Sequence, residues 1–147
     1  MADYSSVCDG RIFESAAPIR ITRELIADFC AAIGETNPLY TDPRAASAGP
    51  HGGIVAPPSL AAIFGDGENI FPHYPQLDTR RLLAGIDMAL LASIRPGDTV
   101  KVTSWISEVY EKTGRSGPMV FVVISSLLTN QNGEVAVRID HRFTNPL

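Results

Sequence analysis

The sequence predicts an α+β domain, in which helices come first and a run of long antiparallel strands follows. Between residues 22 and 34 the apolar residues recur with the period of a helix, whereas after residue 81 they recur at every second position, as in a strand. The chain has 147 residues, which is enough for one domain with a sizeable core. We therefore expect a loose leader at 1–10 and a single domain over 11–147.

The bulk composition is typical of a compact protein that binds neither nucleic acid nor membrane. Hydrophobic residues make up 45% of the chain and charged residues 19%. The net charge of −4 provides no basic footprint for nucleic acid. No apolar run approaches the roughly 18 residues of a membrane span, and the N-terminus lacks the basic start and apolar core of a signal peptide. We therefore expect a cytoplasmic location.

The first predicted helix begins after Thr22, a suitable N-cap, and ends at Gly34. Its apolar residues fall on one stripe and are Leu25, Ile26, Phe29, Cys30 and Ile33. The chain has two cysteines, which do not make a disulfide framework, and Cys30 on this stripe is expected to be a buried free thiol.

Two shorter helices and a long loop follow. Residues 42–49 predict a short helix, and a turn at 50–53 separates it from the wholly apolar helix 59–64, which we expect to be buried. The loop at 65–80 contains two prolines and three large apolar side chains, Ile70, Phe71 and Tyr74. Those side chains fit a pocket wall and plain packing against the core equally well.

Four strands complete the predicted fold. Alternation from Leu82 to Leu90 predicts a strand with one buried face, and a second strand follows over 99–111. Residues 119–129 are almost continuously apolar and predict the central strand, joined through an Asn-Gly turn to a last strand over 135–143. Because a single sheet leaves exposed edges, we expect the chain to pair with a copy of itself or with a similar chain.

The segment GETNPLYTDPRAASAG, residues 34–49, resembles the hydratase motif of the MaoC-like branch of hotdog-fold proteins. That motif reads glycine, aspartate, any residue, asparagine, proline, aliphatic residue, histidine. Residues 52–60 and 114–134 are similar to the N-terminal-type dehydratase half-domains of the same family. The resemblance covers about residues 11 to 146, and it implies a hotdog domain, in which a long antiparallel sheet wraps around a central buried α-helix.

The resemblance also implies an activity. Members of this family are (R)-specific enoyl-thioester hydratases and 3-hydroxyacyl-thioester dehydratases, which add or remove water in the syn sense on CoA or acyl-carrier-protein thioesters. Their aspartate and histidine hold one water and move protons between it and the substrate. A backbone N–H at the start of the central helix polarises the thioester carbonyl. No metal or redox cofactor is implied.

The motif of this chain departs from the family at both proton-transfer positions. Glu35 stands at the aspartate position with one more methylene, and a misplacement of about 1 Å can cost ~10²-fold in rate. Tyr40 stands at the histidine position, although a phenol titrates near ~10 and an imidazole near ~6.5. Asn37 matches and is expected to hold the loop. The central helix starts with two prolines, which have no N–H, so Ser59 or a neighbour would have to supply that donor.

Three hypotheses follow from these departures. In the first, the chain is a working hydratase in which His51 replaces the missing base, oriented by Glu35 or Asp42, with Glu35, Tyr40 and His51 as the catalytic residues. In the second, the chain is the substrate-binding subunit of a heteromeric dehydratase whose partner carries aspartate and histidine. In the third, it is a hotdog thioesterase, in which Glu35 or Asp42 activates water.

Binding of the substrate requires further residues. The phosphates of CoA, or the acidic surface of a carrier protein, call for cations, and an arginine fork binds two phosphate oxygens at once. The candidate cations are Arg80, Arg81, Lys112 and Arg115. The other candidate substrate-binding residues are Asn37, Ser59, Phe71 and Tyr74.

The remaining histidines have ordinary interpretations. His73 lies in a proline-rich loop and is expected at the surface, and His141 alternates with apolar neighbours on the last strand and is expected to be structural. Three scattered histidines and two cysteines lack metal-ligand spacing, so we expect no metal site.

Overall fold

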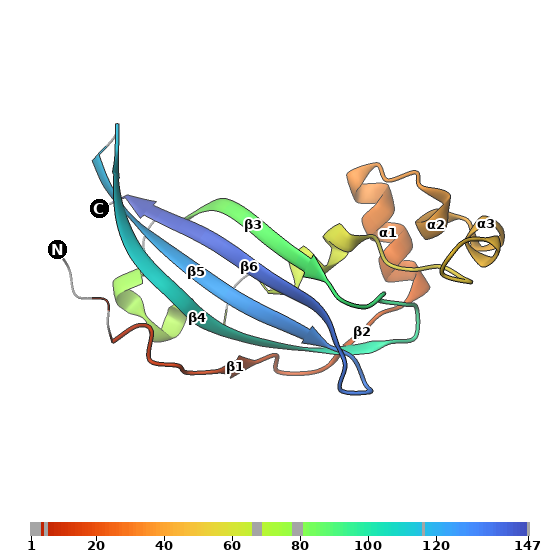
Figure 1. The fold of residues 1–147 in the computed structure, drawn as a ribbon, viewed down its shortest axis with the longest axis horizontal. Coiled ribbons are helices and arrows are strands. Elements are labelled where there is room, and N and C mark those ends of the chain that lie inside the picture. The colour runs from red at the N-terminus through yellow and green to blue at the C-terminus, as the bar shows by residue number, and fades with distance from the viewer. Residues whose placement is uncertain (1–3, 5, 66–68, 78–80, 116, 147) are drawn as a thin grey trace.

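The described residues form an antiparallel sheet of six strands, which curves along the length of the molecule (Figure 1). The computed structural model describes residues 4, 6–65, 69–77, 81–115 and 117–146. The strand order is β1–β4–β5–β6–β3, and β2 also pairs with β4. The strands are β1 (Phe13–Glu14), β2 (Ile19–Arg20), β3 (Leu82–Leu90), β4 (Thr99–Gly114), β5 (Gly117–Thr129) and β6 (Val135–Pro146).

Three α-helices in the described part of the chain gather at one end of the sheet (Figure 1). They are α1 (Arg23–Ile33), α2 (Pro38–Thr41) and α3 (Pro43–Ala48). The predicted ends of the first helix are confirmed. Thr22 Oγ1 accepts the backbone N–H of Leu25 at 3.0 Å, and Gly34 takes a left-handed φ of 69° that favours glycine. None of the described helices is both long enough and apolar enough to cross a bilayer.

The segment expected to be the central α-helix is a 3₁₀-helix, η1 (Pro58–Ile63). Leu60 N–H donates to the Pro57 carbonyl at 2.9 Å, and Phe64 N–H donates to the Ala61 carbonyl at 3.2 Å, which are bonds over three residues. This conformation suits a short segment that begins with proline. The expected burial is confirmed for Leu60 and Ala61, but Ile63 is 51% exposed.

The main core lies between α1, η1 and the sheet. Ile26 and Cys30 of α1 meet Leu60 and Ala61 of η1 over the inner face of the sheet, and all four side chains are at most 2% exposed. The prediction that Cys30 is a buried free thiol is therefore confirmed. Strands β4, β5 and β6 contribute Val100, Val102, Leu128, Ala136, Val137 and Ile139 to the same cluster.

A second core occupies the other end of the sheet. The described part of the long loop forms η2 (Phe71–His73) and η3 (Pro75–Leu77), and both 3₁₀-helices bury apolar side chains against β4 and β5. Val7, within the segment expected to be a leader, is 1% exposed and belongs to this cluster. This part of the N-terminal segment is therefore packed onto the domain.

The central strand and the last hairpin form as the sequence predicts. β5 lies between β4 and β6, and the turn before β6 closes with Asn130 N–H donating to the Glu134 carbonyl at 2.9 Å. His141 on β6 is 2% exposed, and its Nε2 donates to the Ala62 carbonyl at 2.9 Å. This bond fits the structural interpretation of His141.

β3 is a strand, as predicted, but its expected buried face is only partly covered by the described residues. β3 lies at the edge of the sheet and pairs only with β6 in the described residues. Leu82, Leu83, Ile86 and Leu90 are 40–65% exposed. Period-two alternation predicts a strand, but it does not say which element covers each face. Of the alternating residues, Met88 is half-buried against the main core, whereas Leu82, Ile86 and Leu90 are exposed in the described part of the chain.

Replacing Leu60 with alanine tests the packing of η1. Leu60 is fully buried, so we expect Leu60→Ala to lower the free energy of unfolding by about 2–5 kcal/mol. Ile12→Ala is the matched control, since Ile12 is 63% exposed and surface truncations stay within about 0.5 kcal/mol. Urea unfolding measures both, and equal stability of the two variants would contradict the central place of η1.

Candidate functional site

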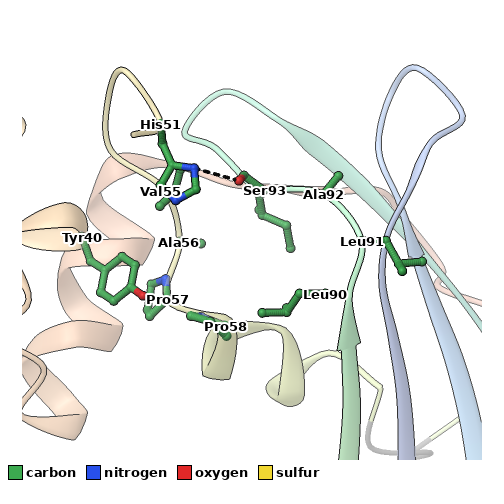
Figure 2. Close-up of a pocket in the computed structure, with 11 residues that line it drawn as sticks. Tyr40, His51, Val55, Ala56, Pro57, Pro58, Leu90, Leu91, Ala92 and Ser93 are labelled. Carbon is green, nitrogen blue, oxygen red and sulfur yellow. Dashed lines mark hydrogen bonds between the residues drawn. The ribbon is translucent and has the colours of Figure 1, made fainter. Parts of the chain in front are cut away.

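A cavity of about 270 Å³ opens between the helical end of the domain and the end of β3 (Figure 2). One wall is the segment 55–58, which leads into η1, and the opposite wall is 90–94, which continues from β3. Tyr40 of α2 and His51 of the following loop complete the lining. Val55, Pro57, Leu90 and Ile94 make the cavity mostly apolar, whereas His51 and Ser93 add polar groups. We refer to it as the main cavity.

Backbone hydrogen bonds hold the walls of the main cavity together. Ala56 N–H donates to the Ile94 carbonyl at 2.8 Å and ties the two walls to each other. Arg95 Nη1 donates to the His51 carbonyl at 2.8 Å and fixes the loop that carries the histidine. The site is therefore formed by segments about 40 residues apart in the sequence.

His51 lies at the exposed rim of this cavity, with Nδ1 3.4 Å from Ser93 Oγ (Figure 2). Neither carboxylate that was expected to orient it does so. Glu35 Oε1 accepts the backbone N–H of Asn37 at 2.8 Å. Asp42 Oδ1 caps α3 by accepting the backbone N–H groups of Arg44 and Ala45. Both side chains are thus used in local turns, which is the usual role of a carboxylate that precedes a helix.

A second cavity, of about 450 Å³, lies beside α1. It is lined by Arg23, Glu24, Ala27, Cys30 and Ala31 of α1, with Glu35, Tyr40, Thr41 and Ile54. Tyr40 is the residue that lines both cavities. The structure therefore brings Tyr40 together with His51 on one side and with Glu35 on the other, and neither cavity is lined by both Glu35 and His51.

The thiol of Cys30 in the second cavity is made less reactive by its burial. Burial raises the pKa of the Cys30 thiol, and the negative charge of Glu35 raises it further. The thiol is therefore neutral at pH 7 and forms part of an apolar wall. Within the described ranges, no group of three or more His, Cys, Asp or Glu side chains is placed to hold a metal ion.

The start of η1 supplies few hydrogen-bond donors to the main cavity. Pro57 and Pro58 line it and have no N–H. Ser59, the first residue of η1 with a backbone N–H, is exposed and does not line the cavity. Asn37 serves a structural role, because its Oδ1 accepts the backbone N–H of Leu39 at 3.0 Å and caps α2.

The two aromatic candidates for a pocket wall lie in the second core. Phe71 is 2% exposed and packs edge-to-face on Phe143, with ring centroids 5.3 Å apart. Tyr74 is 5% exposed, and its hydroxyl donates to the carboxylate of Asp9 at 3.0 Å. Burial, followed by the bond to Asp9, raises the pKa of the Tyr74 phenol. Phe71 and Tyr74 therefore pack against the core, and neither lines the main cavity or the second cavity.

The three candidate cations that the structure describes lie away from the main cavity. Arg81 precedes β3 and places its guanidinium 3.9 Å from the centre of the Phe71 ring, in the second core. Lys112 lies over the Tyr110 ring at 5.1 Å, and Arg115 follows in the β4–β5 hairpin, at the end of the sheet opposite α1–α3 (Figure 1). Arg80 falls outside the described residues.

Sequence reasoning missed Ser93, Arg95 and the wall at 90–94. The sequence does contain a pattern that could have indicated them. In LLASIRPGD, residues 90–98, polar side chains lie in a turn directly after an apolar strand. Such a turn carries function when another loop lies beside it. The sequence could not show that the histidine loop would be that neighbour.

Comparisons with known proteins agree with this architecture. The model of the family described as "FAS1-like, dehydratase domain region" matches residues 9–139. The chain belongs to this family. A relative of this FAS1-like dehydratase domain, the UPF0336 protein of Streptomyces avermitilis, is 35% identical over 71% of this chain and 73% of its own length.

Solved structures confirm the hotdog fold and the resemblance to the MaoC-like family. The MaoC-like dehydratase of Rhodospirillum rubrum is 25% identical, with a TM-score of 0.70 over 93% of each chain. The HadBC (3R-hydroxyacyl-ACP dehydratase) complex of Mycobacterium tuberculosis is 19% identical, with a TM-score of 0.77 over 92% of this chain and 95% of its own. The second likeness is one of fold alone.

Proposed function

We propose that this FAS1-like dehydratase domain binds an acyl thioester of CoA or of acyl carrier protein in the main cavity. In this proposal it takes part in the hydration of 2-enoyl thioesters, or in the reverse dehydration of 3-hydroxyacyl thioesters. The lining of the main cavity supports the proposal, since its walls are mostly apolar and two of its polar side chains, His51 and Ser93, lie together at the rim. An apolar pocket with a few convergent polar groups is typical of a small-molecule site.

The separation of Glu35 from His51 supports a role that depends on a second chain. A general acid–base pair must reach the same substrate atoms, within about 2.6–3.2 Å or through one water. Here the two candidate groups line different cavities, and Glu35 is held by the Asn37 N–H. Tyr40, the residue shared by both cavities, offers a phenol at the position where the family resemblance implies an imidazole. In this proposal the chain contributes the pocket, and a second chain contributes the proton-transfer pair that the described residues do not bring together.

The exposed edge of β3 provides the place for that second chain. Leu82, Leu83 and Ile86 are solvent-exposed on a strand with one unpaired edge, and such an edge is a template for pairing with another strand. The strand continues into Leu90 and Leu91, which line the main cavity. A second hotdog chain paired with β3 would lie beside the cavity and is proposed to supply aspartate and histidine. HadBC, a 3R-hydroxyacyl-ACP dehydratase complex with the same fold, supports the proposal that this chain works together with a second chain.

Comparison of acyl-CoA with free CoA tests the binding proposal. We expect octanoyl-CoA to bind the purified chain at least about tenfold more tightly than CoA, because each buried methylene contributes about 0.8 kcal/mol. Isothermal titration calorimetry measures both affinities. Equal affinity for the two ligands would mean that the main cavity does not take the acyl group.

A chain-alone hydratase is the second candidate, because His51 and Tyr40 line the same cavity. In that case His51 acts as the base and the phenol donates a hydrogen bond to the substrate. Removal of a positioned general base typically lowers the rate by about 10²–10⁴-fold, so His51→Ala would nearly abolish turnover.

A further inference from the structure

A thin wall separates the main cavity from the second cavity. Tyr40 lines both of them. Beside it, Ile54 lines the second cavity, whereas the next two residues, Val55 and Ala56, line the main cavity. The wall that the two cavities share therefore includes Tyr40 and the segment 54–56.

Tyr40 is the bulky part of this wall. Its ring is half-buried and packs against the main core, and its hydroxyl points toward Pro57 at the start of η1 (Figure 2). The backbone around it is fixed, because Tyr40 N–H donates to the Asn37 carbonyl at 3.0 Å and Val55 N–H donates to the Leu39 carbonyl at 3.5 Å. A smaller side chain at position 40 would thus open a gap that the neighbouring backbone cannot close.

The inner surface of the second cavity suits an alkyl chain. Ala27, Cys30 and Ile54 are apolar or neutral, and Cys30 is a thiol held in its neutral form by burial. The charged residues that line the same cavity are Arg23, Glu24 and Glu35. Arg23, Glu24 and Ala27 are exposed and Glu35 is half-buried. Cys30, which is buried, and Ile54, which is half-buried, are the apolar side chains that an acyl chain entering past position 40 would contact.

We infer that Tyr40 sets the length of the acyl group that the chain accepts. Its ring closes the main cavity against the second cavity, so the acyl chain stops at the phenol, and removal of the ring joins the two spaces into one longer pocket. This inference rests on the proposed function, because it takes the main cavity as the acyl site. It assigns to Tyr40 a role in selecting substrates, whatever the source of the catalytic protons.

A chain-length series tests this inference. The affinities of saturated acyl-CoAs from four to twelve carbons are measured by calorimetry for the wild type and for Tyr40→Ala. Each methylene removed from water strengthens binding about fourfold. In the wild type we expect this gain to stop at a defined length. In Tyr40→Ala we expect it to continue, so that dodecanoyl-CoA binds at least about tenfold more tightly than in the wild type.

Two further variants make the result specific. Tyr40→Phe keeps the ring and is expected to keep the wild-type length limit. Ala27→Trp, added to Tyr40→Ala, fills the second cavity from an exposed position on α1 and is expected to cancel the gain. Tyr40→Leu replaces Tyr40→Ala if the alanine variant has lost its cooperative thermal transition.

The outcomes separate the inference from the function on which it rests. If the wild type binds no acyl-CoA of any length, the proposed function fails and the inference fails with it. If the wild type binds the series and Tyr40→Ala shows the same length limit, the inference alone is overturned. A gain in Tyr40→Ala that Ala27→Trp does not cancel would also overturn it, because the extra length would then lie outside the second cavity.

Discussion

Ser93→Trp is expected to weaken the binding of octanoyl-CoA roughly tenfold to hundredfold. Ser93 is exposed and lies at the rim of the main cavity, beside His51. An indole at this position would occupy the entrance, and filling a formed space typically costs about 1–3 kcal/mol, where 1.4 kcal/mol corresponds to tenfold in affinity. Calorimetric titration of octanoyl-CoA into the purified variant measures the loss.

Ser47→Trp is the matched control for this experiment. Ser47 is also an exposed serine, but it lies on α3 and lines neither cavity. We expect its affinity for octanoyl-CoA to equal that of the wild type. If Ser93→Trp bound the ligand as tightly as Ser47→Trp, the acyl group would have to enter elsewhere.

In the absence of the proposed Asp/His-bearing partner, the purified chain is expected to pair with a copy of itself through β3. Ile86→Lys combined with Leu83→Lys is expected to convert this dimer into a monomer. Both residues are exposed on β3, at 54% for Leu83 and 40% for Ile86. Lysine on an edge strand opposes pairing, because a second strand would have to bury its charge. Light scattering should give about twice the chain mass of 15.8 kDa for the wild type and the single chain mass for the variant.

Ile12→Lys is the control for the edge variant. Ile12 is 63% exposed and precedes β1, on the other side of the sheet order from β3. We expect Ile12→Lys to remain a dimer. A wild-type chain that is already monomeric at every concentration would rule out self-pairing through β3, and a dimeric edge variant would move the interface elsewhere.

The sequence predicts local features well because their causes are local. The Thr22 cap, the Gly34 helix end and the Asn-Gly hairpin turn each depend on a few adjacent residues. The central position of β5 also follows from its own apolar sequence. The family could also be predicted from the sequence, because the residues of the motif at 34–49 stand in a fixed order, and the family model matches a range that includes them.

The arrangement of the site could not be predicted, because it depends on contacts between distant segments. Glu35 and His51 are sixteen residues apart in the sequence, yet they line separate cavities. Arg95, which holds the carbonyl of His51, comes from a turn 44 residues further along the chain. The alternation in β3 likewise predicts a strand without identifying the surface that covers it. The positions of Arg81, Lys112 and Arg115 could not be predicted either, because residue type alone does not give a position in the fold.

Incubation of the purified chain with crotonyl-CoA and with a longer enoyl-CoA tests the central claim most directly. Hydration of the double bond, release of free CoA and binding are followed in the same samples. We expect both ligands to bind, with neither hydration nor CoA release above the rate without protein. Hydration by the chain alone, abolished by His51→Ala, would contradict the need for a second chain. Release of free CoA would instead indicate a thioesterase.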